Sequence, residues 1–276
     1  MVVSRNMLEN KKIAFLGAGQ MARALARGFV HAGLLTGEQI VASDPSAGAL
    51  NEFIAFTPGA KQAESNRRAT EKADLVFLAV KPRQIEEVLA EIAPAAAGKL
   101  FVSIAAGIKL ESLAAALGPK ARLIRVMPNT PCLVGQSASA YSVHASATSE
   151  DARTVDGLLS AVGKAFRLEE HLLDAVTGLS GSGPAFVCLV IEALSDGGVK
   201  MGLPRDVATA LAVQTVLGTA RLIQQTEEHP AEVRDRVTSP GGTTIAGLAV
   251  LESAAVRGAL ISAVEQSTLR SQELGR

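Results

Sequence analysis

The segment "KIAFLGAGQMARALARGF" at residues 12–29 constrains the fold more than any other part of the sequence. A buried-strand pattern runs into Gly17 and Gly19, and an Ala-rich helical pattern follows, with Ala22 at the third small position of G-x-G-x-x-G/A. The first glycine permits a tight turn, the second lets the backbone approach a pyrophosphate, and the third small residue lets helix and strand pack closely. The spacing predicts a parallel α/β fold that binds a dinucleotide at a helix N-terminus. The alternative is a strand-to-helix turn without a ligand.

The second expected strand, "QIVASD", ends at Asp44, which lies 27 positions after Gly17. An acid at about this spacing binds the ribose 2′-hydroxyl of NAD. Hydroxyl and guanidinium groups that suit the 2′-phosphate of NADP belong to Ser43, Ser46, Arg67 and Arg68. Asp44 also fits a role as a turn or capping residue. The sequence therefore leaves the choice between NAD and NADP open.

Two further expected strands carry polar groups at their carboxyl ends, where open α/β sheets bind ligands. Lys81 follows "DLVFLAV", and Pro82 favours an extended backbone at Lys81. Asn129, Thr130 and Pro131 follow "RLIRVMP" and offer polar groups on a stiff backbone to a nicotinamide. The alternatives are a solvated lysine and a Pro-rich turn.

Short β-rich segments alternate with helical patterns from residue 11 to about 168, as in a parallel sheet covered by helices. The expected strands are "KIAFLG", "QIVASD", "DLVFLAV", "LFVSIAA", "RLIRVMP", "SASAYSV" and "KAFRL", and a helix opens at Ser149 as its N-cap. After residue 170 the strand signals stop, and Ala/Leu/Val-rich helical segments take over. We expect a disordered leader over residues 1–10, an α/β dinucleotide-binding domain over 11–168 and an all-α domain over 169–276.

The expected helix over residues 184–201, "PAFVCLVIEALSDGGVKM", is apolar nearly all round in its first half. Such a helix is normally buried on every side. A helical domain of this size cannot cover it alone. We therefore expect burial against a second subunit.

The composition argues against several classes of protein and of partner. Lys and Arg number 27 and balance 27 Asp and Glu, so no net charge attracts nucleic acid or an anionic membrane. Two cysteines exclude a disulfide framework and indicate a reducing compartment. The longest run of apolar residues, Ala185–Ile191, is too short to span a bilayer. We expect a soluble cytoplasmic protein without a nucleic-acid or membrane partner.

The usual signatures of phosphoryl transfer and zinc chemistry are absent from the sequence, which has no G-x-x-x-x-G-K-[ST], H-E-x-x-H or C-x-x-C. The histidines are scattered, so we expect no metal; they are His31, His144, His171 and His229. "GLSGSGP" is similar to a serine nucleophile elbow, but no strand clearly leads into it.

Seven segments together are specific in order and spacing: "FLGAGQMARAL", "LAVKPRQ", "SIAAGI", "IRVMPNTP", "GLSGSGPAF", "DGGVKMGLP" and "RDRVTSPGGTTIAGLAVLE". They resemble pyrroline-5-carboxylate reductases over residues 11 to about 274. The resemblance implies a Rossmann domain followed by a helical dimerisation domain, with interlocked dimers often assembled into larger rings. It also implies reduction of 1-pyrroline-5-carboxylate to L-proline by NADPH, with NADH possible.

The resemblance also implies where the ligands bind. The residues expected around the cofactor are Gly17, Ala18, Gly19, Gln20, Met21, Ala22, Ser43, Asp44, Asn66, Ala79, Val80, Lys81, Pro82 and Asn129. The residues expected to bind the substrate are Ser239, Gly241, Gly242, Thr243 and Thr244 of one subunit, placed against the nucleotide domain of the other.

The glycines of "VTSPGGTT" have a physical reason in this scheme. Gly241 and Gly242 would expose backbone N–H groups to the substrate carboxylate without a side chain in the way. Thr244 matches a family position near the ring nitrogen and would align the C=N bond. Glu227 also matches a position near the site, and Lys81 completes the expected catalytic set; a solvated acid is an equal interpretation of Glu227.

Two departures from the family pattern stand out. Gln136 and Ser137 occupy positions where many members carry a further glycine, and Arg234 and Arg236 lie beside the expected anion site. Two alternative functions are an imine reductase for a larger or six-membered cyclic imino acid, and a non-catalytic nucleotide-sensing protein. Intact "GSGPA" and "SPGGTT" segments argue against the second.

Overall fold

The structure is a computed structural model that describes residues 8–275. The chain divides into two compact units, of which the first comprises Met1–Ser182 with Gln266–Arg276 and the second Gly183–Glu265. Most of the expected disordered leader, residues 1–7, lies outside the described residues. The domain boundary expected at residue 168 stays a prediction.

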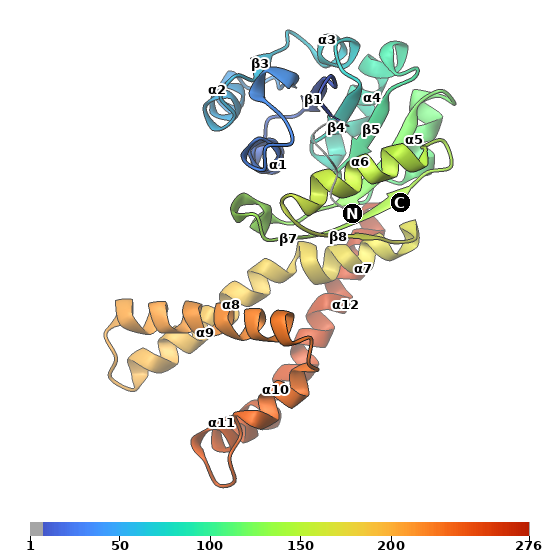
Figure 1. The fold of residues 1–276 in the computed structure, drawn as a ribbon. Helices are drawn as coiled ribbons and strands as arrows, with labels where there is room; N and C mark the ends of the chain where they lie inside the picture. Colours follow the sequence, from blue (N-terminus) through green and yellow to red (C-terminus); the bar gives the residue numbers. More distant parts are fainter. Residues whose placement is uncertain (1–7, 276) are drawn as a thin grey trace. The chain divides into compact units, whose positions relative to one another are not determined.

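The first unit is built on an eight-stranded sheet with the order β3-β2-β1-β4-β5-β6-β7-β8 (Figure 1). The strands are β1 (Ile13–Leu16), β2 (Ile40–Ser43), β3 (Lys61–Gln62), β4 (Leu75–Leu78), β5 (Leu100–Ser103), β6 (Arg122–Met127), β7 (Ser137–Val143) and β8 (Gly163–Arg167). All neighbouring strands are parallel except β6 and β7, which are antiparallel. The sheet is parallel as expected, apart from this one antiparallel pair. A short connection links β6 to β7, and so short a link cannot make a parallel crossover.

Helices cover both faces of the sheet, and alternate strand residues pack against each. On one face lie α1 (Gln20–His31), α2 (Ala47–Phe56) and α6 (Ser149–Ser160); on the other lie α3 (Asn66–Glu71), α4 (Ile85–Ile92) and α5 (Leu110–Leu117). Phe15 packs on the α1 side and stacks on Phe77 with ring centroids 4.7 Å apart. Leu16 packs on the opposite side. The fold confirms the predicted Rossmann-type domain.

Shorter helical segments connect these elements. They are η2 (Gly37–Gln39), η3 (Pro82–Gln84), η4 (Ala93–Ala95), η5 (Thr130–Val134), η6 (Glu170–Leu172), α7 (Leu173–Val176) and the π-helix η7 (Thr177–Gly181). The N-cap of α6 is Thr148, one residue before the expected Ser149. Thr148 and Asp151 form a reciprocal capping box, which fixes the helix start at this residue.

The second unit is helical, as predicted. It contains α8 (Gly183–Lys200), α9 (Arg205–Thr226), α10 (Pro230–Arg236), α11 (Thr243–Ser253) and the first part of α12 (Val256–Leu274). The α8 and α9 helices pack together where Gly198 meets Ala208, and the hydroxyls of Ser195 and Thr209 are 2.8 Å apart.

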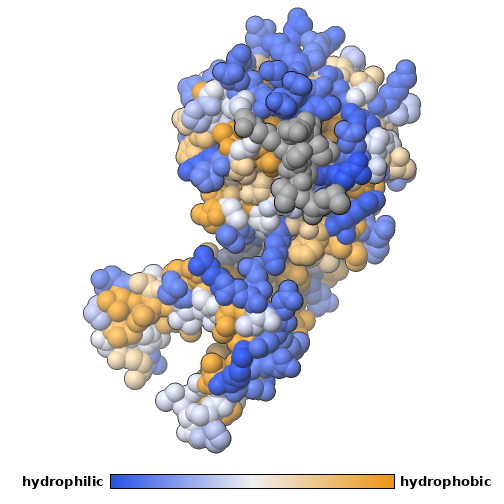
Figure 2. Space-filling model, viewed as in Figure 1, coloured by the Kyte–Doolittle hydropathy of each residue, from blue (hydrophilic) through white to orange (hydrophobic). Residues whose placement is uncertain are grey.

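The expected helix over 184–201 is not buried within the chain. Ser195 is the buried residue of α8, whereas Leu189 and Met201 are 66% and 82% exposed. Figure 2 shows apolar residues gathered on the α8–α9 part of the second unit, whereas hydrophilic residues cover much of the rest of this unit on the face in view. Large apolar patches of this kind mark interaction surfaces.

By length and composition alone, the stretches Glu170–Lys200 and Arg205–Thr226 are apolar enough to cross a membrane. Taken together as a pair bent by 51°, the helices α11 and α12 are also long and apolar enough to cross a membrane. The shortness of the run Ala185–Ile191 therefore does not by itself exclude a membrane span, because interspersed small and weakly polar residues lengthen the apolar stretch.

Candidate functional site

The turn after β1 is shaped by Gly17. Its φ of +98° lies in the region that favours glycine, and a Cβ there would be 2.6 Å from the Ala79 carbonyl oxygen. The Gly17 N–H donates to the Ser43 carbonyl at 2.7 Å, and the Ala79 N–H donates to Leu16 at 2.8 Å. The ends of β1, β2 and β4 are thus held together, with Gly17 in the space where no side chain fits.

Gly19, in contrast, faces open space. A Cβ at Gly19 would meet nothing within 4 Å, so the packing of the chain does not require glycine there. Gly19 is the N-cap of α1 and makes no side-chain cap hydrogen bond. The first-turn N–H groups of Gln20, Met21 and Ala22 therefore have no partner within the helix. An open, uncapped helix N-terminus between the ends of β1 and β4 fits the pyrophosphate of a dinucleotide.

Asp44 serves the turn itself. One of its carboxylate oxygens accepts from the Ala18 N–H at 2.9 Å, and the other accepts from the Ser46 N–H at 2.8 Å. The Ser43 side chain is buried, and the Ser46 hydroxyl accepts from Ala49 as the N-cap of α2. Of the two interpretations that the sequence left open for Asp44, this geometry favours the turn role.

Asn66 and its neighbours stand at the N-terminus of α3. The Asn66 amide nitrogen donates to Glu91 Oε2 at 2.8 Å, and the Arg67 N–H donates to Glu91 Oε1 at 3.0 Å. The guanidinium groups of Arg67 and Arg68 both bond Glu71 and lower the pKa of that carboxyl group. Glu91 could not be identified from the sequence, because an acid on an amphipathic helix normally faces solvent.

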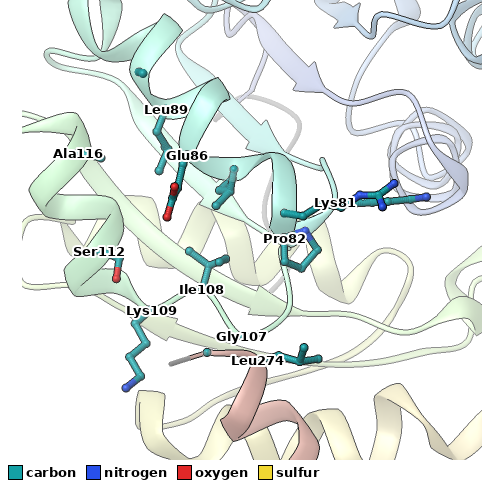
Figure 3. A pocket seen from close by; sticks show the side chains of 14 residues that line it. Lys81, Pro82, Glu86, Leu89, Gly107, Ile108, Lys109, Ser112, Ala116 and Leu274 are labelled. Atoms are coloured by element: carbon teal, nitrogen blue, oxygen red, sulfur yellow. The ribbon is translucent and has the colours of Figure 1, made fainter.

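Lys81 is exposed and is the N-cap residue of η3, with Pro82 as the first residue of that segment. It lines a groove of about 1080 Å³ between α4, α5 and the end of α12. Figure 3 shows Glu86 and Ser112 on one side of this groove and Lys81 on the opposite side. None of residues 17–22 lines the groove, so the groove is separate from the glycine turn.

Asn129 is buried, and protein groups occupy its side chain at both ends. The amide nitrogen donates to the Ser180 carbonyl at 3.0 Å, and the amide oxygen accepts from the Ala138 N–H at 2.9 Å. Cys132, three residues on, lies 3.5 Å from the Met21 sulfur, and burial raises the pKa of its thiol to about 11. A buried neutral thiol is a poor nucleophile, so thiolate chemistry has no support at this turn.

The second unit contains the other expected site, at the start of α11. Gly241 has a φ of +67°, which favours glycine, and Gly242 is the N-cap without a side-chain cap hydrogen bond. The expectation that the Gly242 N–H is free for an anion is wrong, because it donates to the Ser239 carbonyl at 3.1 Å. The turn closes in this way and leaves the first-turn N–H groups of Thr243, Thr244 and Ile245 without a partner inside the helix.

The remaining predicted residues of this unit differ in exposure. Thr244 is half-buried in the first turn of α11, and Glu227 is exposed at the end of α9 with a left-handed φ of 56°. Arg236 pairs with Glu228, and Arg234 bonds Asp235 at 2.9 Å, so both arginines have acidic partners within the chain. Across residues 8–275, no group of three or more His, Cys, Asp or Glu side chains is placed to hold a metal ion.

Comparisons with known proteins agree on one family. The family model described as pyrroline-5-carboxylate reductase dimerisation matches residues 170–274, and the model described as NADP oxidoreductase coenzyme F420-dependent matches residues 12–107. Pyrroline-5-carboxylate reductase 3 of Rattus norvegicus is 44% identical over 98% of this chain and 98% of its own length. The Glycine max pyrroline-5-carboxylate reductase is 46% identical over 96% and 97% of the two chains.

Solved structures give the same result. The Plasmodium falciparum pyrroline carboxylate reductase, crystallised with NADP bound, has a TM-score of 0.89 at 33% identity and covers 97% of this chain and 99% of its own. The Coxiella burnetii pyrroline-5-carboxylate reductase has a TM-score of 0.88 at 33% identity, over 96% and 99% of the two chains. The glycine turn, the helical unit and these relatives together show that the chain belongs to the pyrroline-5-carboxylate reductase family.

Proposed function

We propose that this protein reduces the C=N bond of 1-pyrroline-5-carboxylate to give L-proline, the last step of proline biosynthesis, with NADPH as the cofactor. The observation that carries the proposal is the uncapped N-terminus of α11 behind Gly241 and Gly242, because it offers N–H groups to a small carboxylate. Full-length relatives that carry the same name support the assignment.

The residues around the glycine turn fit a dinucleotide. The open space beside Gly19 and the free N–H groups of the first turn of α1 would receive the pyrophosphate. Val80, Lys81 and Pro82 follow β4 on the other side of the topological switch point. The bound nicotinamide supplies the hydride that reduces the imine carbon.

NADPH is the cofactor that the comparisons favour. The two carboxylate oxygens of Asp44 each accept one backbone N–H group, so this residue shapes the turn that would receive the cofactor. The P. falciparum relative was crystallised with NADP. NADH remains a second substrate for the same site, since its pyrophosphate is identical.

The substrate carboxylate would bind the first turn of α11. The N–H groups of Thr243, Thr244 and Ile245 converge at a helix N-terminus, where the helix dipole also favours an anion. The Ser239 hydroxyl is exposed one turn before them and adds a donor. Each hydrogen bond to a charged group contributes about 1.5–3 kcal/mol, so two or three of them suffice to hold so small a ligand.

Thr244 would orient the ring nitrogen. Its hydroxyl is too weak an acid to protonate an imine alone at neutral pH, so its role is to align the C=N bond and stabilise the protonated ring. Glu227 would stabilise the cationic nitrogen, and Lys81 would complete the site from the nucleotide-binding domain of a second subunit.

A second copy of the chain would cover the apolar helices of the second unit. The family model for residues 170–274 is a dimerisation domain, which gives the exposed side chains of α8 and α9 a partner of the same composition. A subunit interface would explain why Glu170–Lys200 and Arg205–Thr226 are apolar enough to cross a membrane, without placing them in a bilayer. We propose a soluble cytoplasmic homodimer or larger homo-oligomer, with a dinucleotide-binding domain over 11–168 and a dimerisation domain over 169–276.

The proposal is tested by steady-state kinetics on the full chain. Oxidation of NADPH and of NADH is followed with 1-pyrroline-5-carboxylate, in wild type, Thr244→Ala and the matched control Thr244→Ser. Loss of a single stabilising donor costs about 10²-fold or more in kcat, so Thr244→Ala should be strongly impaired and Thr244→Ser should retain most activity. Equal activity of all three proteins would remove Thr244 from the site.

The same assay separates the substrate from a larger ring. The six-membered homologue of the substrate is supplied at equal concentration, and the two kcat/KM values are compared. We expect the five-membered ring to be preferred. Preference for the larger ring, or no turnover by protein that binds NADPH, would refute the assignment of the substrate.

A further inference from the structure

The "GLSGSGP" motif at residues 178–184 is not used by the proposed chemistry, yet it has an unusual conformation. Residues Thr177–Gly181 form a π-helix between α7 and α8. The Ser182 N–H donates to the Thr177 carbonyl, five residues back, at 2.9 Å. Single π-turns are rare and interrupt the ordinary helical ladder. Such a turn needs support from outside the helix.

The Ser180 carbonyl shows where that support comes from. In a regular helix this carbonyl accepts from the N–H of residue 184. That residue is Pro184, which has no N–H group. Instead, the Asn129 amide nitrogen donates to the Ser180 carbonyl at 3.0 Å, from 51 positions away in the sequence.

The orientation of the Asn129 amide is fixed by its partners. The oxygen accepts from the Ala138 N–H at 2.9 Å and from the Ser137 hydroxyl at 3.1 Å. The Ala138 N–H can only donate and the Ser180 carbonyl can only accept, so the amide has one orientation that satisfies both. Asn129 is buried, and its side chain thus joins the start of β7 to the π-helix.

A second contact seats the π-helix in the same place. A Cβ at Gly181 would be 2.6 Å from the terminal methyl group of Met127, the last residue of β6. The π-helix therefore contacts the Met127 side chain at the carboxyl end of β6, and because that methyl group is the far end of a flexible side chain, Met127 can move to make room for an alanine at Gly181. The contacts of Asn129 and Gly181 are independent, and both hold the segment against the ends of β6 and β7.

We propose that Asn129 is a positioning residue. It holds the π-helix of residues 177–181 at the carboxyl edge of the sheet, and its side chain does not bind the cofactor. This role differs from the cofactor contact that the resemblance implied. Of the three measurements that test this role, only kcat rests on the proposed reductase function.

Two variants and one control test this role. Asn129→Asp keeps an acceptor for Ala138 and loses the donor to Ser180. Asn129→Leu keeps a side chain of similar size and loses both the donor to Ser180 and the acceptor for Ala138. The control, Ser137→Ala, removes one bond to Asn129 and keeps the bond to Ser180. Each full-length protein is examined by amide hydrogen exchange over residues 177–183, by fluorescence titration with NADPH, and by kcat.

We expect Asn129→Asp and Asn129→Leu to speed exchange over 177–183 by about tenfold or more, because an opened segment exchanges faster. The NADPH dissociation constant should stay within about twofold of wild type in both, while kcat falls in both. Ser137→Ala should match wild type in exchange. A weaker affinity for NADPH in the two Asn129 variants, with unchanged exchange, would make Asn129 a cofactor ligand and overturn the proposal.

The two proposals fail in different ways. If wild type binds NADPH but does not reduce 1-pyrroline-5-carboxylate, the proposed function fails, while exchange and NADPH affinity still decide the role of Asn129. If Asn129→Asp does not fold, Asn129→Leu provides the comparison. Normal exchange over 177–183 and normal kcat in Asn129→Leu would then refute the positioning role, because the bond to Ser180 would not be what holds the π-helix.

Discussion

A buried arginine makes the sharpest prediction about what holds the first unit together. The Arg125 side chain on β6 is 5% exposed, and its guanidinium lies 3.1 Å from Glu170 Oε1 and 3.7 Å from Asp174 Oδ1. The same Glu170 oxygen accepts from the Leu110 N–H at 2.7 Å, and Asp174 accepts from the Ser271 hydroxyl at 2.7 Å. One guanidinium thus organises the start of α5, α7 and the end of α12.

The cost of removing Arg125 follows from this burial. Loss of one partner of a buried ion pair costs about 3–5 kcal/mol, because the remaining charge is left unpaired. The Glu170 and Asp174 side chains are 30% and 16% exposed, so water partly compensates them, and we expect the lower end, about 3 kcal/mol, for Arg125→Met. Methionine keeps most of the apolar stem, so the loss reports the charge.

The matched control is Arg270→Met, since Arg270 pairs with Glu273 on the surface and is 67% exposed. An exposed pair contributes about 0–1 kcal/mol. Urea unfolding followed by circular dichroism, at one protein concentration for all variants, gives both free energies of unfolding. A destabilisation of Arg125→Met within about 1 kcal/mol of the control would refute the view that this network is a structural centre.

Four further predictions concern the glycine turn, the cofactor and two buried ionisable groups. Gly19→Ala should keep the stability of wild type and lose NADPH affinity, since a methyl group there meets only open space, whereas Gly17→Ala should also lower the melting temperature. Asp44→Ala should weaken NADPH and NADH about equally in titrations, because Asp44 shapes the turn; a loss confined to NADH would restore its ribose role. Burial raises the pKa of Tyr141 from 10 to about 12, so its contribution to stability is present below pH 10 and is lost between pH 10 and 12. In alkaline unfolding, the free energy of unfolding of Tyr141→Phe should therefore fall less over this range than that of wild type. Cys132, with its thiol pKa raised to about 11, should resist iodoacetamide in the native protein and react in urea, as mass spectrometry of the peptides would show; rapid native labelling would contradict its burial.

The sequence predicted the features that depend on local chemistry. The glycine turn was predictable because G-x-G-x-x-A combines a positive φ, an open approach and close helix packing within six residues, and the structure shows the first two at Gly17 and Gly19. The strands were predictable because buried parallel strands are short apolar runs. The switch to helices after residue 170 was predictable from the disappearance of these runs.

Features that depend on which hydrogen-bonding groups pair in the folded chain, whether near or far in the sequence, were not predictable. The bond from Asn129 to Ser180 joins residues 51 positions apart, and no local pattern identifies that pair. Asp44 is an acid, the residue type that binds a ribose, yet both of its carboxylate oxygens accept backbone N–H groups of the turn. The Gly242 N–H is consumed by Ser239, because the turn before α11 closes on itself. In each case, the role of the polar group depends on the partner with which it pairs in the folded chain.

The exposure of α8 shows a different limit. Its composition predicts a covered helix, but one chain does not supply the cover. A sequence specifies the apolar surface and leaves its partner unnamed. The family model for dimerisation over residues 170–274 supplies the partner that the proposal adopts.

The most direct test of the account is the identity of the product. Purified protein is incubated with 1-pyrroline-5-carboxylate and NADPH. The oxidised cofactor is quantified by absorbance, and the amino acid formed is quantified by chiral chromatography. The account predicts L-proline in a one-to-one ratio with NADP⁺, and a strong loss of both in Thr244→Ala. NADPH-binding protein that forms no proline, or that forms it equally well without Thr244, would contradict the account.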